Sequence, residues 1–178
     1  MQIVIVYESL FGNTHEIAEA IAEGLREARP DAQVACLQVA VAGADATRGA
    51  DLLVVGGPTH LRGMSFGLSR KMALKAEETE AKAGLAAHEP EAGAEGPGVR
   101  DWFHSLPRPE PGSRAAAFDT RLGKPMSGGA AHVIARRLSH HGYIVVAEPE
   151  GFIIEDADDG PLSKGEHDRA KAWGASLV

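Results

Sequence analysis

A short loop between the first apolar run and the first helical pattern carries the residues best suited to bind a phosphate. It reads Ser9-Leu10-Phe11-Gly12-Asn13-Thr14, with three small polar side chains and one glycine. Backbone N–H groups at a helix start lack intrahelical acceptors, and the helix dipole adds partial positive charge there. A phosphate dianion satisfies both, so the loop is predicted to bind phosphate. A capped helix start without a ligand stays open as the alternative.

Other phosphate chemistries are limited by the residues that the sequence lacks. A nucleoside-triphosphate loop needs a lysine directly after its last glycine, and Asn13 stands there instead. The dinucleotide pattern G-x-G-x-x-G is absent from this position. A phospho-accepting receiver needs clustered acids after the first and third strands, where Glu8 is the single candidate. A cysteine phosphatase would need a thiolate in this loop, but the only cysteine is Cys36.

The flanking residues predict strands and helices that alternate along the chain. Short runs rich in β-branched and small apolar residues predict strands at 2–7, 33–39, 51–57, 114–118 and 143–147, with 152–154 as a continuation. Helical spacing predicts helices at 15–28, 66–83 and 128–141, and a last one opened by a capping box at 163–166. The third strand is expected to end at Gly57, because Pro58 cannot donate to a ladder.

This alternation indicates an α/β fold with a parallel sheet and helices on both faces. In such sheets a ligand binds beyond the carboxyl ends of the strands, where the strand order reverses. The loops after Tyr7, Gly57 and Phe118 are therefore the expected site.

Composition and charge fit one globular domain spanning residues 1–178. Hydrophobic residues make up 44% of the chain, and the formal net charge is −7. An acidic protein is a poor partner for nucleic acid or an anionic membrane, so we expect neither. The sequence has no basic leader and no apolar stretch of about 20 residues, which favours a cytoplasmic protein without membrane insertion.

The segment at about 84–112 differs from the rest in composition. Its first half is rich in Gly, Pro, Ala and Glu, which is typical of a flexible excursion. Its second half places Val99, Trp102, Phe103 and Leu106 on one face of a short amphipathic stretch. We expect a flexible Gly/Pro/Glu-rich insertion at about 84–112.

The chain resembles the flavodoxin family, whose members bind FMN. The likeness lies in Gly12-Asn13-Thr14 after the first strand, in Gly56-Gly57-Pro58-Thr59 after the third, and in the five alternating strands. It covers nearly the whole chain except about 84–112. The resemblance implies a three-layer α/β/α sandwich with a five-stranded parallel sheet in the order 2-1-3-4-5, and FMN as cofactor.

The resemblance also implies which positions contact FMN. The phosphate would be held by Ser9, Leu10, Phe11, Gly12, Asn13 and Thr14. One side of the flavin ring would be flanked by Pro58, Thr59, His60, Leu61, Arg62 and Gly63. The other side would be flanked by a loop with Asp119, Thr120 and Arg121. No catalytic residue and no metal site are expected.

Two departures from the family pattern bear on the flavin. Phe11 stands where the family usually has a hydroxyl residue, and neither flanking loop has a Trp or Tyr to stack on the ring. His60 is the nearest substitute, ahead of Phe11, Phe66 and Phe118. If Arg62 or Arg121 reaches the ring, it would stabilise a reduced anionic flavin; the alternative is that both point into water.

Two function classes follow. The first is an FMN-dependent redox protein that passes electrons between a reductase and an acceptor protein, or to a small quinone-type acceptor as an NAD(P)H:quinone-type oxidoreductase. The second is a protein of the same fold that does not use flavin and binds another phosphate-bearing ligand or a protein partner. The missing ring-stacking aromatics keep the second class open.

Overall fold

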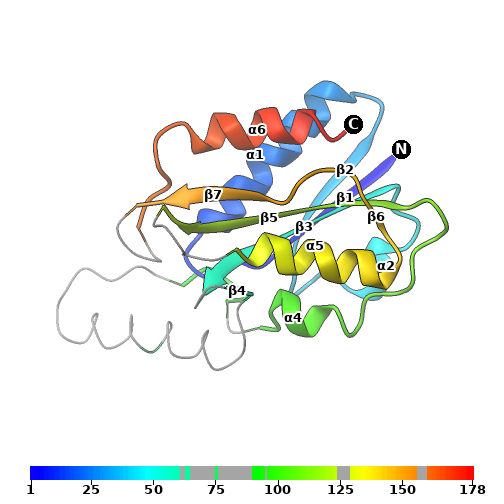
Figure 1. Ribbon diagram of the computed structural model, residues 1–178, viewed down its shortest axis with the longest axis horizontal. Helices are drawn as coiled ribbons and strands as arrows, with labels where there is room; N and C mark the ends of the chain where they lie inside the picture. Colours follow the sequence, from blue (N-terminus) through cyan, green and yellow to red (C-terminus); the bar gives the residue numbers. More distant parts are fainter. Residues whose placement is uncertain (61–62, 65–74, 76–89, 95, 124–128, 156–159) are drawn as a thin grey trace.

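The computed structural model describes residues 1–60, 63–64, 75, 90–94, 96–123, 129–155 and 160–178 (Figure 1). Its centre is a sheet in which β1 (Gln2–Tyr7) lies between β2 (Gln33–Gln38) and β3 (Leu52–His60). Beyond β3 come β5 (Arg114–Leu122) and then β6 (Ile144–Val145), and β7 (Glu150–Ile154) continues along the outer part of β5. All these pairs are parallel, so the predicted order 2-1-3-4-5 is confirmed, with the fifth strand in two pieces.

Helices cover both faces of the sheet. The long helices α1 (Asn13–Ala28) and α6 (Glu166–Ala175) lie on one face, and α5 (Ala130–His141) covers the other (Figure 1). The short helices α2 (Ala44–Thr47) and α4 (Val99–Trp102) complete the second layer. Each face has its own core, because side chains alternate between the faces along every buried strand. The predicted three-layer arrangement is therefore confirmed.

The third strand is longer than predicted. It runs past Gly57 and pairs with β5 at Gly57 and Pro58, then turns back through β4 (Gly63–Met64), which pairs with Thr59 and His60. The backbone of residue 58 faces the β1 side of the strand, but β1 has ended before this point. The last hydrogen bond on that side is from Glu8 N–H to the Gly56 carbonyl. The missing N–H of Pro58 therefore costs no ladder bond.

The start of α6 also differs from the prediction. Gly165, with φ of 88°, is the N-terminal cap, and no side chain caps this helix. Instead of bonding back to Ser163, the Glu166 carboxylate accepts a hydrogen bond from Ile153 N–H at 2.8 Å and pairs with Arg169. The capping-box prediction is wrong because Glu166 is used to join α6 to β7. By contrast, Gly142 ends α5 with φ of 115°, as predicted.

The described part of the 84–112 segment packs against the domain. Trp102 is buried and donates its indole N–H to the Ala42 carbonyl at 2.6 Å, and Val99, Phe103 and Leu106 are buried with it. The Glu8 carboxylate, at the end of β1, accepts a hydrogen bond from Val99 N–H at 2.8 Å. Residues 84–89 and 95, like the predicted helix at 66–83 apart from Lys75, lie outside the described residues. An insertion there stays a prediction. Within the described part of the chain, no helix is long and apolar enough to span a bilayer.

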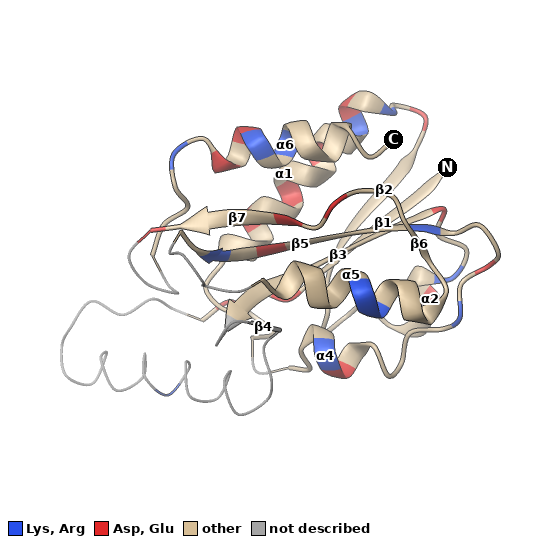
Figure 2. Ribbon diagram, viewed as in Figure 1, with Lys and Arg blue, Asp and Glu red and all other residues tan. Residues whose placement is uncertain are grey.

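Charges of both signs are mixed along the α1 and α6 layer (Figure 2). Lys171 of α6 reaches two carboxylates of α1, Glu23 at 2.7 Å and Glu27 at 2.8 Å. Beneath these pairs the two helices approach closely at two glycines. A Cβ added to Gly24 would lie 2.0 Å from the Lys171 carbonyl oxygen, and one added to Gly174 would lie 2.4 Å from that of Ile21.

We expect Gly24→Ala to lower the free energy of unfolding by about 1–3 kcal/mol, because α6 must move away from α1. The substitution also raises helix propensity by up to about 1 kcal/mol, but a clash with backbone outweighs that gain. Urea denaturation measures the change. Gly43→Ala, where nothing lies within 4 Å of the added carbon, is the control and should stay within about 0.5 kcal/mol. A Gly24→Ala variant as stable as the wild type would contradict the close packing.

Candidate functional site

The carboxyl ends of β1, β3 and β5 meet at one edge of the sheet, and α1 begins there. Gly12 precedes this helix with φ of 97°, a left-handed conformation that other residues rarely adopt. Among the described residues, no side chain caps α1, and nothing lies within 4 Å of a β-carbon built on Gly12. The first-turn N–H groups of this 16-residue helix therefore have no side-chain acceptor in the described part of the chain, at the edge where a ligand is expected. This geometry fits a phosphate.

The polar side chains of the loop hold it in shape. The Ser9 hydroxyl oxygen accepts a hydrogen bond from Gly12 N–H at 3.1 Å. The Asn13 amide donates to the Gly160 carbonyl at 2.7 Å, and the Thr14 hydroxyl lies 2.8 Å from that of Thr120. The loop is therefore tied to β5 and to the segment before α6. Phosphate binding here would depend on backbone N–H groups more than on side-chain donors.

Sequence reasoning missed one residue beside this loop. Glu91 donates its backbone N–H to the Leu10 carbonyl at 2.8 Å, and its carboxylate lies 2.7 Å from Nδ1 of His15. The His15 ring stacks on Tyr7 with centroids 4.9 Å apart. A single acid in a Pro- and Glu-rich stretch gives no signal of such a contact. The segment at 90–94 thus closes one side of the loop.

Side chains at the ends of β3 and β5 accept hydrogen bonds from the start of α5. The Thr59 hydroxyl oxygen accepts a hydrogen bond from Ala130 N–H at 2.8 Å, and the Asp119 carboxylate accepts one from Ala131 N–H, also at 2.8 Å. Asp119 is completely buried, and its other carboxylate oxygen lies 3.2 Å from Nε of Arg121. These acceptors satisfy the first N–H groups of α5. The corresponding N–H groups of α1 have no side-chain acceptor among the described residues.

Asp119, Thr120 and Arg121 lie within β5, which corrects the prediction that they form a loop. They are held in the strand because Asp119 pairs with both Gly57 of β3 and Gly151 of β7. The Arg121 guanidinium occupies the space that a side chain at Gly151 would fill. Its charge is directed at Asp119 inside the protein.

The other predicted contacts divide between described and undescribed residues. Pro58, Thr59 and His60 lie in β3 and Gly63 lies in β4, and the two strands pair antiparallel. Leu61 and Arg62 lie outside the described residues.

All four Trp and Tyr residues of the chain are used elsewhere. Trp102 and Tyr143 pack in the core under α5, while Tyr7 and Trp173 pack in the core under α1 and α6. Phe118 is fully buried against Phe152, so it is excluded as a ring-stacking residue. Phe11 is partly buried in the loop, and Phe66 lies outside the described residues. The edge therefore fits the phosphate of FMN better than its ring.

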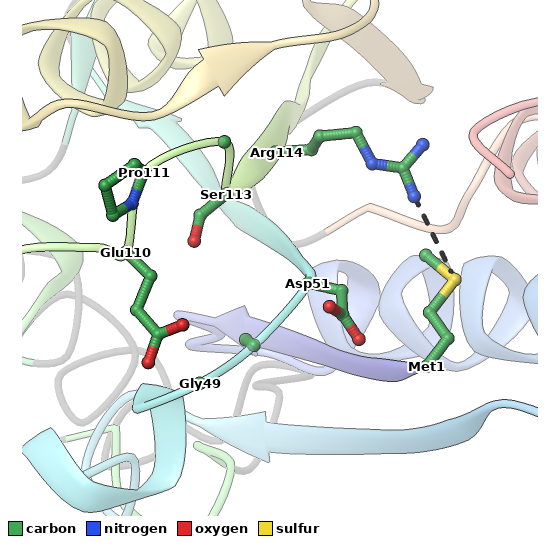
Figure 3. Close-up of a pocket in the computed structure, with 9 residues that line it drawn as sticks. Met1, Gly49, Asp51, Glu110, Pro111, Ser113 and Arg114 are labelled. Carbon is green, nitrogen blue, oxygen red and sulfur yellow. Dashed lines mark hydrogen bonds between the residues drawn. The ribbon is translucent and has the colours of Figure 1, made fainter.

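A cavity of about 510 Å³ lies at the opposite edge of the sheet (Figure 3). Its lining comes from Met1 and from the residues just before β3 and β5, which are the amino ends of the strands. Arg114 reaches across it to the Met1 sulfur, 3.9 Å away. Ligands of open parallel sheets bind at the carboxyl edge, so we do not assign the site here.

Burial raises the pKa of the Asp119 carboxyl, while Ala131 N–H, Arg121 and the Thr59 hydroxyl oppose the shift. Because the folded state binds this proton more tightly, the stability contribution is full below the unfolded pKa of about 3.9 and falls as pH rises above it. We therefore expect Asp119→Asn, which does not titrate, to gain stability relative to the wild type as pH rises above the unfolded pKa of about 3.9. Urea denaturation at several pH values measures this difference. A difference independent of pH would contradict the assignment.

Comparison with known proteins identifies the fold. No protein-family model matches the sequence, and no curated protein matches it either. Solved flavodoxin structures match nearly the whole chain. A flavodoxin from the domain Archaea is 21% identical with a TM-score of 0.62, over 99% of this chain and 96% of that one. Flavodoxin 1 from Bacillus cereus is 17% identical with a TM-score of 0.66, over 100% and 97%.

The two-electron reduced flavodoxin of Megasphaera elsdenii is 18% identical, with a TM-score of 0.59 over 98% of both chains. At such low identity the likeness bears on architecture, and it agrees with the observed strand order and helix layers. This chain has a flavodoxin-like fold.

Proposed function

We propose that this protein binds FMN non-covalently and transfers electrons through it. The observation that carries the proposal is the open start of α1, which lies beside the β1–β3 boundary where the strand order reverses. Gly12 leaves room for an anion there, and no side chain of the described residues caps the helix in its place. The fold shared with flavodoxins of Archaea and Bacillus cereus supports the same ligand.

In this proposal the segment from Ser9 to Thr14 binds the phosphate with its backbone N–H groups. Asn13 and Thr14 hold the loop in place through Gly160 and Thr120. Binding therefore costs the loop little further conformational entropy. The hairpin from Pro58 to Gly63 flanks one side of the ring. The end of β5, with Asp119, Thr120 and Arg121, supports the other side and fixes the start of α5.

FMN supplies the electron-transfer chemistry, and the protein orients it and sets its electrostatic surroundings. Because Arg121 is paired with the buried Asp119, it brings no uncompensated positive charge to the edge. The electron acceptor in this proposal is a partner protein or a small quinone.

A second function is favoured by one observation, the use of every Trp and Tyr in the two cores or against His15. A protein that binds only a phosphate-bearing ligand would need no ring-stacking aromatic. The two functions differ in how much the flavin ring contributes to the binding free energy. Stacking of the ring on an aromatic side chain adds about 0.5–1.5 kcal/mol beyond the buried area. Affinities for FMN, riboflavin and inorganic phosphate separate them.

We expect the protein to quench FMN fluorescence at micromolar concentration and to bind riboflavin at least about 30-fold more weakly, because charge-assisted hydrogen bonds contribute about 1.5–3 kcal/mol each. Gly12→Ala should weaken FMN binding at least about tenfold and leave riboflavin binding within about twofold, because Ala strains the left-handed position.

Gly142→Ala is the matched control, because Gly142 has φ of 115° at the other end of the sheet. It introduces comparable strain and should leave the FMN affinity unchanged. Equal affinity for FMN and riboflavin would contradict the phosphate loop. Binding of inorganic phosphate without any flavin would favour the second function.

A further inference from the structure

The helix α5 differs in charge from the rest of this acidic protein. Its twelve residues include two arginines and three histidines but no aspartate or glutamate, although the chain has a formal net charge of −7. Figure 2 shows basic residues and no acidic ones along α5, whereas both kinds are mixed along α1 and α6.

Arg137 of α5 lies beside the end of α4. The Arg137 guanidinium lies over the Phe103 ring, 5.7 Å from its centroid. The end of α5 is joined to the same segment, since the His141 ring lies 3.0 Å from the Pro107 carbonyl oxygen. Burial and the positive charges of Arg100 and Arg136 lower the pKa of Arg137. We call Arg136 and Arg137 the arginine patch.

Cations on the opposite layer are placed differently. Arg26 is 3.8 Å from Glu19, Lys171 lies between Glu23 and Glu27, and Arg169 pairs with two further carboxylates. Among the residues that the structure describes, no carboxylate forms an ion pair with Arg136 or Arg137. Gathering like charges lowers stability, and the contact of Arg137 with the Phe103 ring offsets that loss for one of the two arginines. An external anionic surface would relieve the repulsion.

We infer that the arginine patch is a docking surface for an acidic protein. Charge complementarity requires an anionic partner, and the net charge of −7 repels extended polyanions such as duplex DNA and continuous anionic membranes. A compact acidic protein surface can meet the patch without meeting the acidic remainder. Arg136 is six residues into α5 from Ala130, about 9 Å along the axis, so the partner would cover the middle of α5.

The test uses a fluorescently labelled poly-L-glutamate of about 6 residues, short enough to meet the patch without the acidic remainder, at about 20 mM salt, where exposed charges are weakly screened. Fluorescence anisotropy should show binding that weakens steeply as salt is raised. The double variant Arg136→Glu/Arg137→Glu should bind at least about tenfold more weakly, since reversal adds like-charge repulsion. The double variant Arg26→Glu/Arg29→Glu at the end of α1 makes the same change in net charge and should bind within about twofold of the wild type.

The outcomes separate the proposal from its alternatives. Equal loss in both double variants would mean that net charge alone governs binding and would overturn the patch. Failure of the wild type to bind at low salt would overturn it as well. Duplex DNA, or vesicles containing phosphatidylserine, bound as tightly as poly-L-glutamate would identify a polyanion or membrane surface instead. None of these measurements requires FMN, so the result is independent of the proposed redox function.

Discussion

Two long helices, α1 and α5, begin at the same edge of the sheet, and their first N–H groups need acceptors that the helices cannot supply. The chain satisfies them differently. At α5 the acceptors are internal, namely the Thr59 hydroxyl and the buried Asp119 carboxylate. At α1, no side chain in the described part of the chain caps the helix, and nothing lies within 4 Å of a β-carbon built on the left-handed Gly12. The candidate site exists because one helix start is filled and its neighbour is not.

The same edge is also organised electrostatically. Asp119 is completely buried, and Arg121 reaches it because Gly151 leaves room for the guanidinium. This arginine therefore stabilises the acceptor of α5 instead of facing a ligand. The positive potential offered to an anion comes mainly from the dipole and N–H groups of α1. Excess cationic charge on this side of the molecule lies farther along α5, in the arginine patch.

Local sequence signals predicted most of the architecture. The buried strands are short runs of β-branched and small apolar residues, and the switch to helical spacing after Thr14 places the loop at a strand–helix boundary. Gly142 marked the end of α5 correctly, because a left-handed cap requires little more than a glycine at the end of a periodic pattern. The strand order follows from alternation, handedness and the resemblance to a known fold.

Features that depend on distant residues were not predictable. The strand β3 continues through Gly57 and Pro58 because β5 still pairs with it there. Pro58 faces the other side, so its missing N–H breaks no hydrogen bond of this ladder. Asp119 and Arg121 were expected in a loop because the family resemblance implied one after the fourth strand, but β7 extends the ladder beside them. Glu91 meets the loop from a segment whose composition predicts no contact at all. Ser163 and Glu166 fit a capping box locally, and the contact of Glu166 with β7 prevails.

The most direct test of the open helix start is a two-dimensional ¹⁵N–¹H spectrum of the protein recorded during titration with FMN. We expect the amide signals of Asn13 and Thr14 to shift most. The amides of Gly12, Ala130 and Ala131, which already donate to Ser9, Thr59 and Asp119, should move less. Shifts concentrated around Gly49 and Asp51 at the opposite edge, or no shift at the start of α1, would contradict it.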